Sequence, residues 1–158
     1  FGANVIGINR QGNFVEGCNR IITFDRLDEI LPKTDILYVA LPETPETINI
    51  IDHRRLSMLK PSCGIINVGR QSAIDYESLI KMLQEKKLAG AILDVFTPEP
   101  IVKNDNLWNV PNLIITPHVS ADDGKSYIEH TLDLFFKNLN NFISKKPLHN
   151  KVDRELGY

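Results

Sequence analysis

The chain has 158 residues, of which 42% are hydrophobic and 24% charged, an ordinary balance for one globular domain. Its formal net charge of −2 offers no positive surface for nucleic acid or an anionic membrane, and no apolar run approaches transmembrane length. Cys18 and Cys63 stand alone without a CxxC spacing, so neither a disulfide framework nor a metal site is expected. We therefore expect a cytoplasmic protein without nucleic-acid or membrane partners.

Strand-like and helix-like patterns alternate along the chain, which predicts parallel βαβ units. A short helical turn is expected near Leu27, ended by Pro32, and a longer helix passes through Leu56 and Leu59. Short runs rich in β-branched residues predict strands at residues 5–8, 21–24, 35–41, 64–68, 91–95 and 113–116.

Two amphipathic helices follow from the spacing of apolar residues. Asp75 is a predicted N-cap, and Tyr76, Leu79, Ile80 and Leu83 recur at helical spacing after it. A second, longer helix is expected from about Asp122. Its apolar face consists of Ile128, Leu132, Phe135, Phe136, Leu139 and Ile143.

Three chemically active side chains follow three of the predicted strands. Arg70, Glu99 and His118 each lie just past an apolar run, where an open α/β sheet has its ligand crevice. An imidazole there can donate a proton, a carboxylate can orient it and stabilise the imidazolium, and a guanidinium can bind a substrate carboxylate. The alternatives are a structural histidine, an exposed loop glutamate and a surface cation.

Five segments in order and register resemble the D-isomer-specific 2-hydroxyacid dehydrogenases. They are residues 35–47 (DILYVALPETPET), 67–70 (NVGR), 90–100 (GAILDVFTPEP), 106–118 (NLWNVPNLIITPH) and 150–158 (NKVDRELGY). The resemblance implies an α/β fold, a Rossmann-like doubly wound parallel sheet that binds a dinucleotide. It also supports Arg70, Glu99 and His118 as the catalytic residues.

The resemblance further implies that the chain is incomplete at its N-terminus. The family's Gly-rich loop and its substrate domain would precede Phe1, residues 1–148 would form a partial dinucleotide-binding domain, and residues 149–158 would cross towards the substrate domain. The missing strand would lie mid-sheet, with strands 5–8 and 35–41 on one side and the later strands on the other. Unpaired edges invite aggregation, so we expect residues 1–158 alone not to form a stable, active enzyme.

The family likeness also assigns residues to the cofactor. Asp94 would contact the nicotinamide carboxamide; the alternative is a purely structural role, because a buried aspartate needs hydrogen-bond donors in any case. Asn9 and Arg10 stand at the end of the strand where NAD enzymes usually carry an acid, which tips the expectation towards NADP, with NAD still open and a solvent-facing Arg10 as the alternative. The remaining residues expected to line the cofactor are Leu41, Pro42, Thr47, Val68 and Gly69.

The function that this resemblance implies is hydride transfer between NAD(P) and a small D-2-hydroxy acid or 2-keto acid, such as hydroxypyruvate or glyoxylate. The alternative is a cofactor-sensing binding protein, because the family also resembles corepressors that use this fold for protein association. A homodimer is expected by the same resemblance, with apolar area offered by Trp108 and the last helix.

Overall fold

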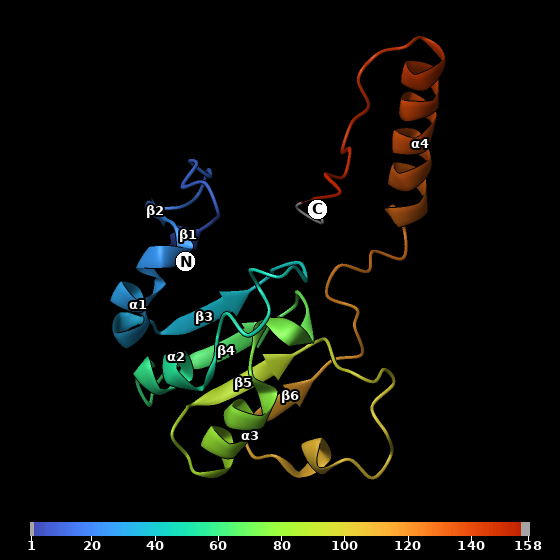
Figure 1. Ribbon diagram of the computed structural model, residues 1–158. Coiled ribbons are helices and arrows are strands. Elements are labelled where there is room, and N and C mark those ends of the chain that lie inside the picture. The colour runs from blue at the N-terminus through green and yellow to red at the C-terminus, as the bar shows by residue number, and fades with distance from the viewer. Residues whose placement is uncertain (1, 156–158) are drawn as a thin grey trace.

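A parallel sheet of four strands organises the protein (Figure 1). The computed structural model describes residues 2–155; Phe1 and residues 156–158, the end of the expected crossing tail, lie outside the described part. The strands are adjacent in chain order: β3 (Ile36–Val39), β4 (Gly64–Asn67), β5 (Gly90–Leu93) and β6 (Leu113–Ile115). All pairs are parallel, so the four carboxyl ends meet at one edge of the sheet.

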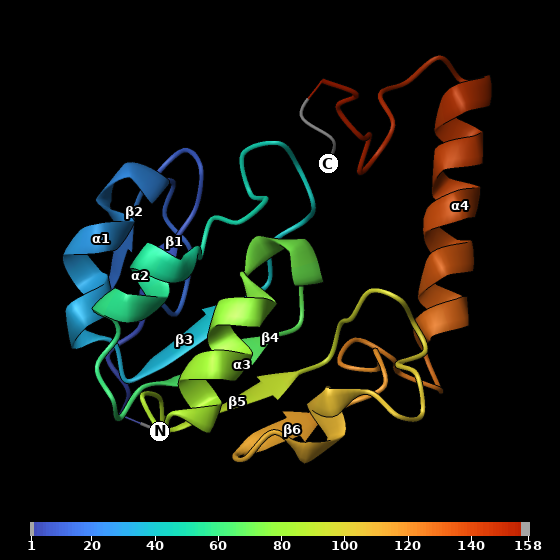
Figure 2. The ribbon, with the colours of Figure 1, turned by 60° about the horizontal axis from the view of Figure 1, so that its bottom comes forward.

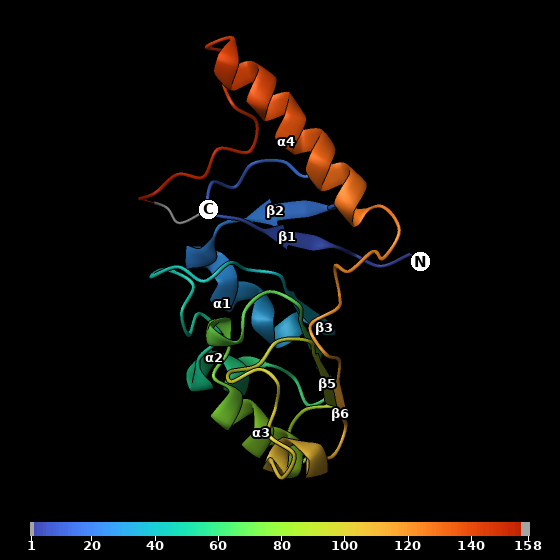
Figure 3. The same ribbon diagram turned by 90° about the vertical axis from the view of Figure 1, so that its right-hand side faces the viewer.

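A second, two-stranded parallel sheet contains β1 (Ile6–Ile8) and β2 (Arg20–Ile22). The expected position of the strand at 35–41 was therefore wrong in one respect. This strand, β3, pairs with β4 through Ile36↔Gly64 to Val39↔Asn67 and so belongs with the later strands rather than with β1. Figure 3 shows β1 and β2 apart from the larger sheet.

Three short helices cover one face of the larger sheet (Figures 2 and 3). They are α1 (Leu27–Ile30), α2 (His53–Met58) and α3 (Tyr76–Gln84). The core lies between them and the sheet, and its least accessible side chains include Leu31, Leu56, Ile65, Leu79 and Leu93. In the described residues the opposite face of the sheet carries no helix, so the doubly wound arrangement is present only in part.

Side-chain caps fix where two of these helices begin. The Asp75 carboxylate accepts a hydrogen bond from the Ser78 N–H at 3.1 Å, as the sequence predicted, and Asp52 does the same for the Arg55 N–H at 2.8 Å. Short 3-10 helices complete the connections. They are η1 (Phe24–Arg26), η2 (Leu31–Lys33), η3 (Gln71–Ala73) and η4 (Asn106–Asn109).

Some element boundaries differ from the sequence-based expectation. Phe24 opens η1 rather than ending a strand, because β2 stops at Ile22. Pro32 lies inside η2 and does not end the turn, since the first positions of a helix need no N–H from proline.

The long helix α4 (Tyr127–Ile143) stands away from the sheet (Figure 1). It begins later than expected because residues around Asp123 form a turn in which the Ser126 and Lys125 N–H groups bond to the Asp123 carboxylate. None of its residues is buried. The tail folds back along it, where Asn138 and His149 exchange hydrogen bonds of 2.8 and 3.0 Å. No helix in residues 2–155 is long and apolar enough to cross a bilayer.

Candidate active site

The carboxyl ends of β5 and β6 bring a glutamate and a histidine into contact. His118 Nδ1 lies 2.8 Å from Glu99 Oε2, and the other carboxylate oxygen accepts the Phe96 N–H at 2.7 Å. The imidazole hydrogen bond, then the Phe96 N–H, lowers the pKa of Glu99 below its ordinary value. An ionised carboxylate only accepts, so Nδ1 is the donor and the other ring nitrogen remains for a ligand.

The backbone at His118 adopts a left-handed conformation with φ of 57°. Residues other than glycine adopt this region rarely, and such residues gather at functional sites where the surrounding structure enforces them. The His118 side chain is 45% exposed, so its ring is accessible at the rim. The loop after β6 therefore presents the imidazole to solvent while Glu99 fixes its orientation.

Asp94 enforces the conformation of that loop. Its carboxylate accepts hydrogen bonds from the Val119 N–H at 3.0 Å, the Ser120 N–H at 2.9 Å and the Thr116 hydroxyl. Burial alone would raise the pKa of Asp94, which is 1% exposed, but these hydrogen bonds outweigh it and lower the pKa to about 2. The ionised Asp94 thus clamps the residues on both sides of His118.

Arg70 lies on the same edge of the sheet, after β4. Its guanidinium is exposed and donates to the Gly69 carbonyl at 2.8 Å. Gly69 is buried, and a Cβ there would lie 2.5 Å from the Leu41 nitrogen, so only glycine lets this turn pack against the chain that leaves β3. The structure therefore joins Glu99 to His118 directly and places Arg70 one strand away, at the end of β4.

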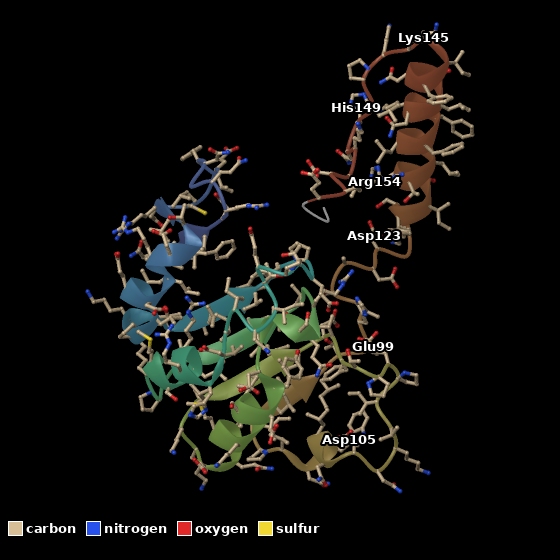
Figure 4. All side chains as sticks on the ribbon, in the orientation of Figure 1. Glu99, Asp105, Asp123, Lys145, His149 and Arg154 are labelled. Carbon is tan, nitrogen blue, oxygen red and sulfur yellow. The ribbon has the colours of Figure 1, made fainter. Side chains whose placement is uncertain are left out.

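A cleft of about 520 Å³ opens beside the Glu99–His118 pair. Its apolar wall includes Ile101, Trp108 and Ile115. Figure 4 shows Glu99 on the segment between β5 and η4, and Asp105 at the base of the same loop. Trp108, expected as a packing or interface aromatic, is half-exposed in this wall and donates its ring N–H to the Val102 carbonyl at 3.0 Å.

The residues expected at the cofactor fall into two groups. Val68 and Leu41 are half-buried just past the ends of β4 and β3, next to Gly69 and the exposed Pro42. The Thr47 hydroxyl is buried and donates to the Pro42 carbonyl at 2.6 Å, so it shapes its own loop.

The second group follows β1. Asn9 accepts hydrogen bonds from the Gln11 and Asn13 N–H groups at 3.2 and 3.1 Å and so shapes the loop. The Arg10 guanidinium lies 2.7 Å from the Glu46 carboxylate, on the loop after β3. A dinucleotide that carries phosphate fits this donor set, because Arg10 supplies a planar cation beyond the end of a parallel strand.

Two polar residues at this edge were not singled out from the sequence. Asn67 is fully buried at the end of β4, and Tyr76, expected only in the core, directs its hydroxyl to the end of β5. An asparagine that ends a run of isoleucines was the available signal, because a buried amide needs hydrogen-bond partners.

Comparison with known proteins identifies the family to which this fold belongs. Residues 1–120 match the model of the NAD binding domain of the D-isomer specific 2-hydroxyacid dehydrogenases. A glyoxylate reductase of Thermococcus gammatolerans is 40% identical over 98 residues, which cover 62% of this chain and 29% of that protein. The matched residues cover 52% of a curated relative from Corynebacterium melassecola and 29% of this reductase, so the chain spans about half the length of these relatives or less.

Solved structures give the same result. A D-isomer specific 2-hydroxyacid dehydrogenase from Xanthobacter autotrophicus Py2, crystallised with NADPH and MES, superposes with a TM-score of 0.90 at 30% identity, over 99% of this chain and 64% of that one. An NADPH-dependent glyoxylate/hydroxypyruvate reductase from Sinorhizobium meliloti, in complex with NADP and sulfate, gives 0.89 at 31% identity, over 99% of this chain and 50% of that one. The chain belongs to the D-isomer specific 2-hydroxyacid dehydrogenase family.

Proposed function

We propose that the protein containing this chain transfers a hydride between a nicotinamide cofactor and a small D-2-hydroxy acid or 2-keto acid of the glyoxylate or hydroxypyruvate type. The observation that carries the proposal is the 2.8 Å contact between His118 Nδ1 and Glu99 Oε2 at the rim of a cleft. A carboxylate-oriented imidazole beside an apolar cleft is suited to proton transfer at a carbonyl oxygen.

In this reaction His118 is the general acid. Its outer ring nitrogen donates a proton to the ketone oxygen of the 2-keto acid while the carbonyl carbon is reduced, and it takes the hydroxyl proton in the reverse direction. Glu99 holds the ring through Nδ1 and stabilises the imidazolium before the proton leaves. Asp94, through the Val119 and Ser120 N–H groups, holds the loop on which His118 stands.

Arg70 binds the other end of the substrate. Arg70 is exposed, and the planar fork of its guanidinium matches the two oxygens of an α-carboxylate. This contact orients the keto group towards His118 and polarises it. A bound nicotinamide cofactor supplies or accepts the hydride.

The cofactor residues of the proposal are those after β1, β3, β4 and β5. With a cofactor bound, Asp94 would act beside the nicotinamide carboxamide through the loop that it holds, because its own carboxylate is buried and bonded to Thr116, Val119 and Ser120. Arg10 would exchange the Glu46 carboxylate for a 2′-phosphate, which favours NADP over NAD. The relatives crystallised with NADPH or NADP support this preference. The proposal includes a homodimer, because apolar side chains such as Phe135 and Phe142 on α4 are more than half exposed.

A turnover panel tests this function. The protein containing residues 1–158 is assayed with glyoxylate, hydroxypyruvate, pyruvate and phenylpyruvate, each with NADPH and with NADH, by loss of nicotinamide absorbance. We expect turnover of the small keto acids and a higher kcat/KM with NADPH than with NADH. Absence of turnover with every pair would overturn the proposed function, and NADH preference would overturn the role of Arg10.

A further inference from the structure

A buried polar chain joins the turn that carries Arg70 to the segment that carries Glu99. It begins at Asn67, which is 0% exposed at the end of β4. The Asn67 side-chain carbonyl accepts the Gly69 N–H at 3.1 Å, and its amide donates to the Arg70 carbonyl at 3.1 Å. One side chain thus holds the Arg70 turn at both ends.

Tyr76 continues the chain to the neighbouring strand. Its hydroxyl accepts a second hydrogen bond from the Asn67 amide at 3.0 Å and donates to the Val95 carbonyl at 3.1 Å. Burial holds the pKa of Tyr76 far above its ordinary value, so the hydroxyl keeps its proton and remains a donor. The bridge therefore links the ends of β4 and β5 through a side chain of α3.

The far end of the bridge reaches the acid pair. Val95 precedes Phe96, whose N–H donates to the Glu99 carboxylate at 2.7 Å, while the Phe96 ring packs edge-on against the Tyr76 ring with centroids 6.2 Å apart. The Asp75 cap fixes the first turn of α3, where Tyr76 stands. Two hydrogen bonds, one to the Val95 carbonyl and one from the Phe96 N–H, and the peptide unit between them separate the tyrosine hydroxyl from the Glu99 carboxylate.

We propose that Tyr76 is a positioning residue, whose hydroxyl sets the distance between the substrate-binding Arg70 and the Glu99–His118 pair. This inference rests on the proposed function for the roles of those residues. The hydroxyl is buried and makes its hydrogen bonds with the Asn67 amide and the Val95 carbonyl. Tyr76 therefore acts through the loop that carries Arg70 and the loop that carries Glu99, and not on the substrate. A fully satisfied buried network of this kind specifies a unique arrangement.

Replacement of the hydroxyl tests the inference. Tyr76→Phe keeps the ring against Phe96 but leaves the Val95 carbonyl without its donor and removes one acceptor from Asn67. We expect the KM for the 2-keto acid to rise about fivefold or more and kcat to fall, with the KM for NADPH unchanged within about twofold. An unchanged KM for the keto acid, or an equal rise in both KM values, would overturn the inference.

Cys63→Ala is the matched control. Cys63 is fully buried just before β4, at the opposite end of the strand from Arg70, so its loss lowers stability without touching the bridge. We expect this variant to melt at a lower temperature and keep both KM values. If Tyr76→Phe does not fold, Asn67→Ser breaks the same bridge from the other side, with the same expected split between the two KM values.

Hydrogen exchange separates this inference from the proposed function. In Tyr76→Phe, amides in residues 69–73 and 96–99 should exchange about fivefold faster or more than in Cys63→Ala, whether or not any keto acid is turned over. Equal exchange in the two variants would overturn the positioning role. If no keto acid is turned over but the amides of Tyr76→Phe exchange faster, the proposed function is overturned. The inference that Tyr76 positions the two loops then still holds.

Discussion

Two neighbouring rows of side chains cross the four-stranded sheet and point to opposite faces. The first row, Leu37, Ile65, Ala91 and Leu113 in register, lies under α1, α2 and α3; Ile65 is 1% exposed. The second row is one residue further along each strand and lies on the open face. It consists of Tyr38, Ile66, Ile92 and Ile114, and its outer members Tyr38 and Ile114 are 60% and 58% exposed.

The difference shows that the apolar pattern of a strand does not decide whether one or both of its faces are buried. Continuous apolar runs are typical of parallel strands buried on both faces, and these strands have such runs. The helices of the described chain supply a cover for one face only. The strands end one residue after the open row, on the covered face, where Asn67 and Leu93 are in register and fully buried directly before the loops that carry Arg70 and Glu99. The covered face is therefore the part that holds these loops.

We expect the largest loss of stability from a substitution on the covered face of the sheet, and the same substitution on the open face is the comparison. Ile65→Ala should lower the free energy of unfolding by about 2–5 kcal/mol, because it opens a cavity under the helices. Ile114→Ala, the same chemical change on the open face, should cost no more than about 0.5 kcal/mol. Urea unfolding of both variants measures the two values. Equal losses would show that the open face is buried against a partner in solution.

A smaller effect concerns the buried charge beside the site. The pKa of Asp94 is about 2 when folded against an ordinary 3.8, so its ionised form contributes about 2 kcal/mol of stability. Because the folded value is the lower one, the contribution is complete above about pH 4 and is lost as pH falls towards 2.

Asp94→Asn checks the sign of this dependence. The variant should have a lower free energy of unfolding than the wild type at pH 6. The difference between the two free energies should become smaller as the pH falls from about 4 towards 2. Asp133→Asn, on the exposed side of α4, is the control and should leave stability within about 0.5 kcal/mol. A gap that stays constant between pH 6 and pH 3 would contradict the ionised clamp.

The shared position of Arg70, Glu99 and His118 at one edge of the sheet was predictable from sequence because one simple rule places it. Arg70, Glu99 and His118 each follow a strand, and the carboxyl ends of parallel strands share an edge. The Asp75 cap was predictable for a similarly local reason, since a cap and its N–H partner are three residues apart.

Features that depend on contacts between distant residues were not predictable. The apolar run at 35–41 predicts a strand but not its neighbour, so its pairing with β4 was misplaced. Tyr76 fits the apolar face of α3, and nothing in its spacing indicates that its hydroxyl bridges Asn67 and Val95. The amphipathic pattern of α4 predicts an apolar face without indicating whether anything covers it.

Substitution of two histidines tests most directly whether His118 is the proton donor. His118→Gln and His130→Gln are assayed for NADPH-dependent reduction of the best keto acid; His118 contacts Glu99, and His130 is exposed on α4. We predict that His118→Gln lowers kcat by about 10²–10⁴-fold at unchanged folding, while His130→Gln keeps the wild-type value. Wild-type turnover in folded His118→Gln would contradict the assignment of the proton donor.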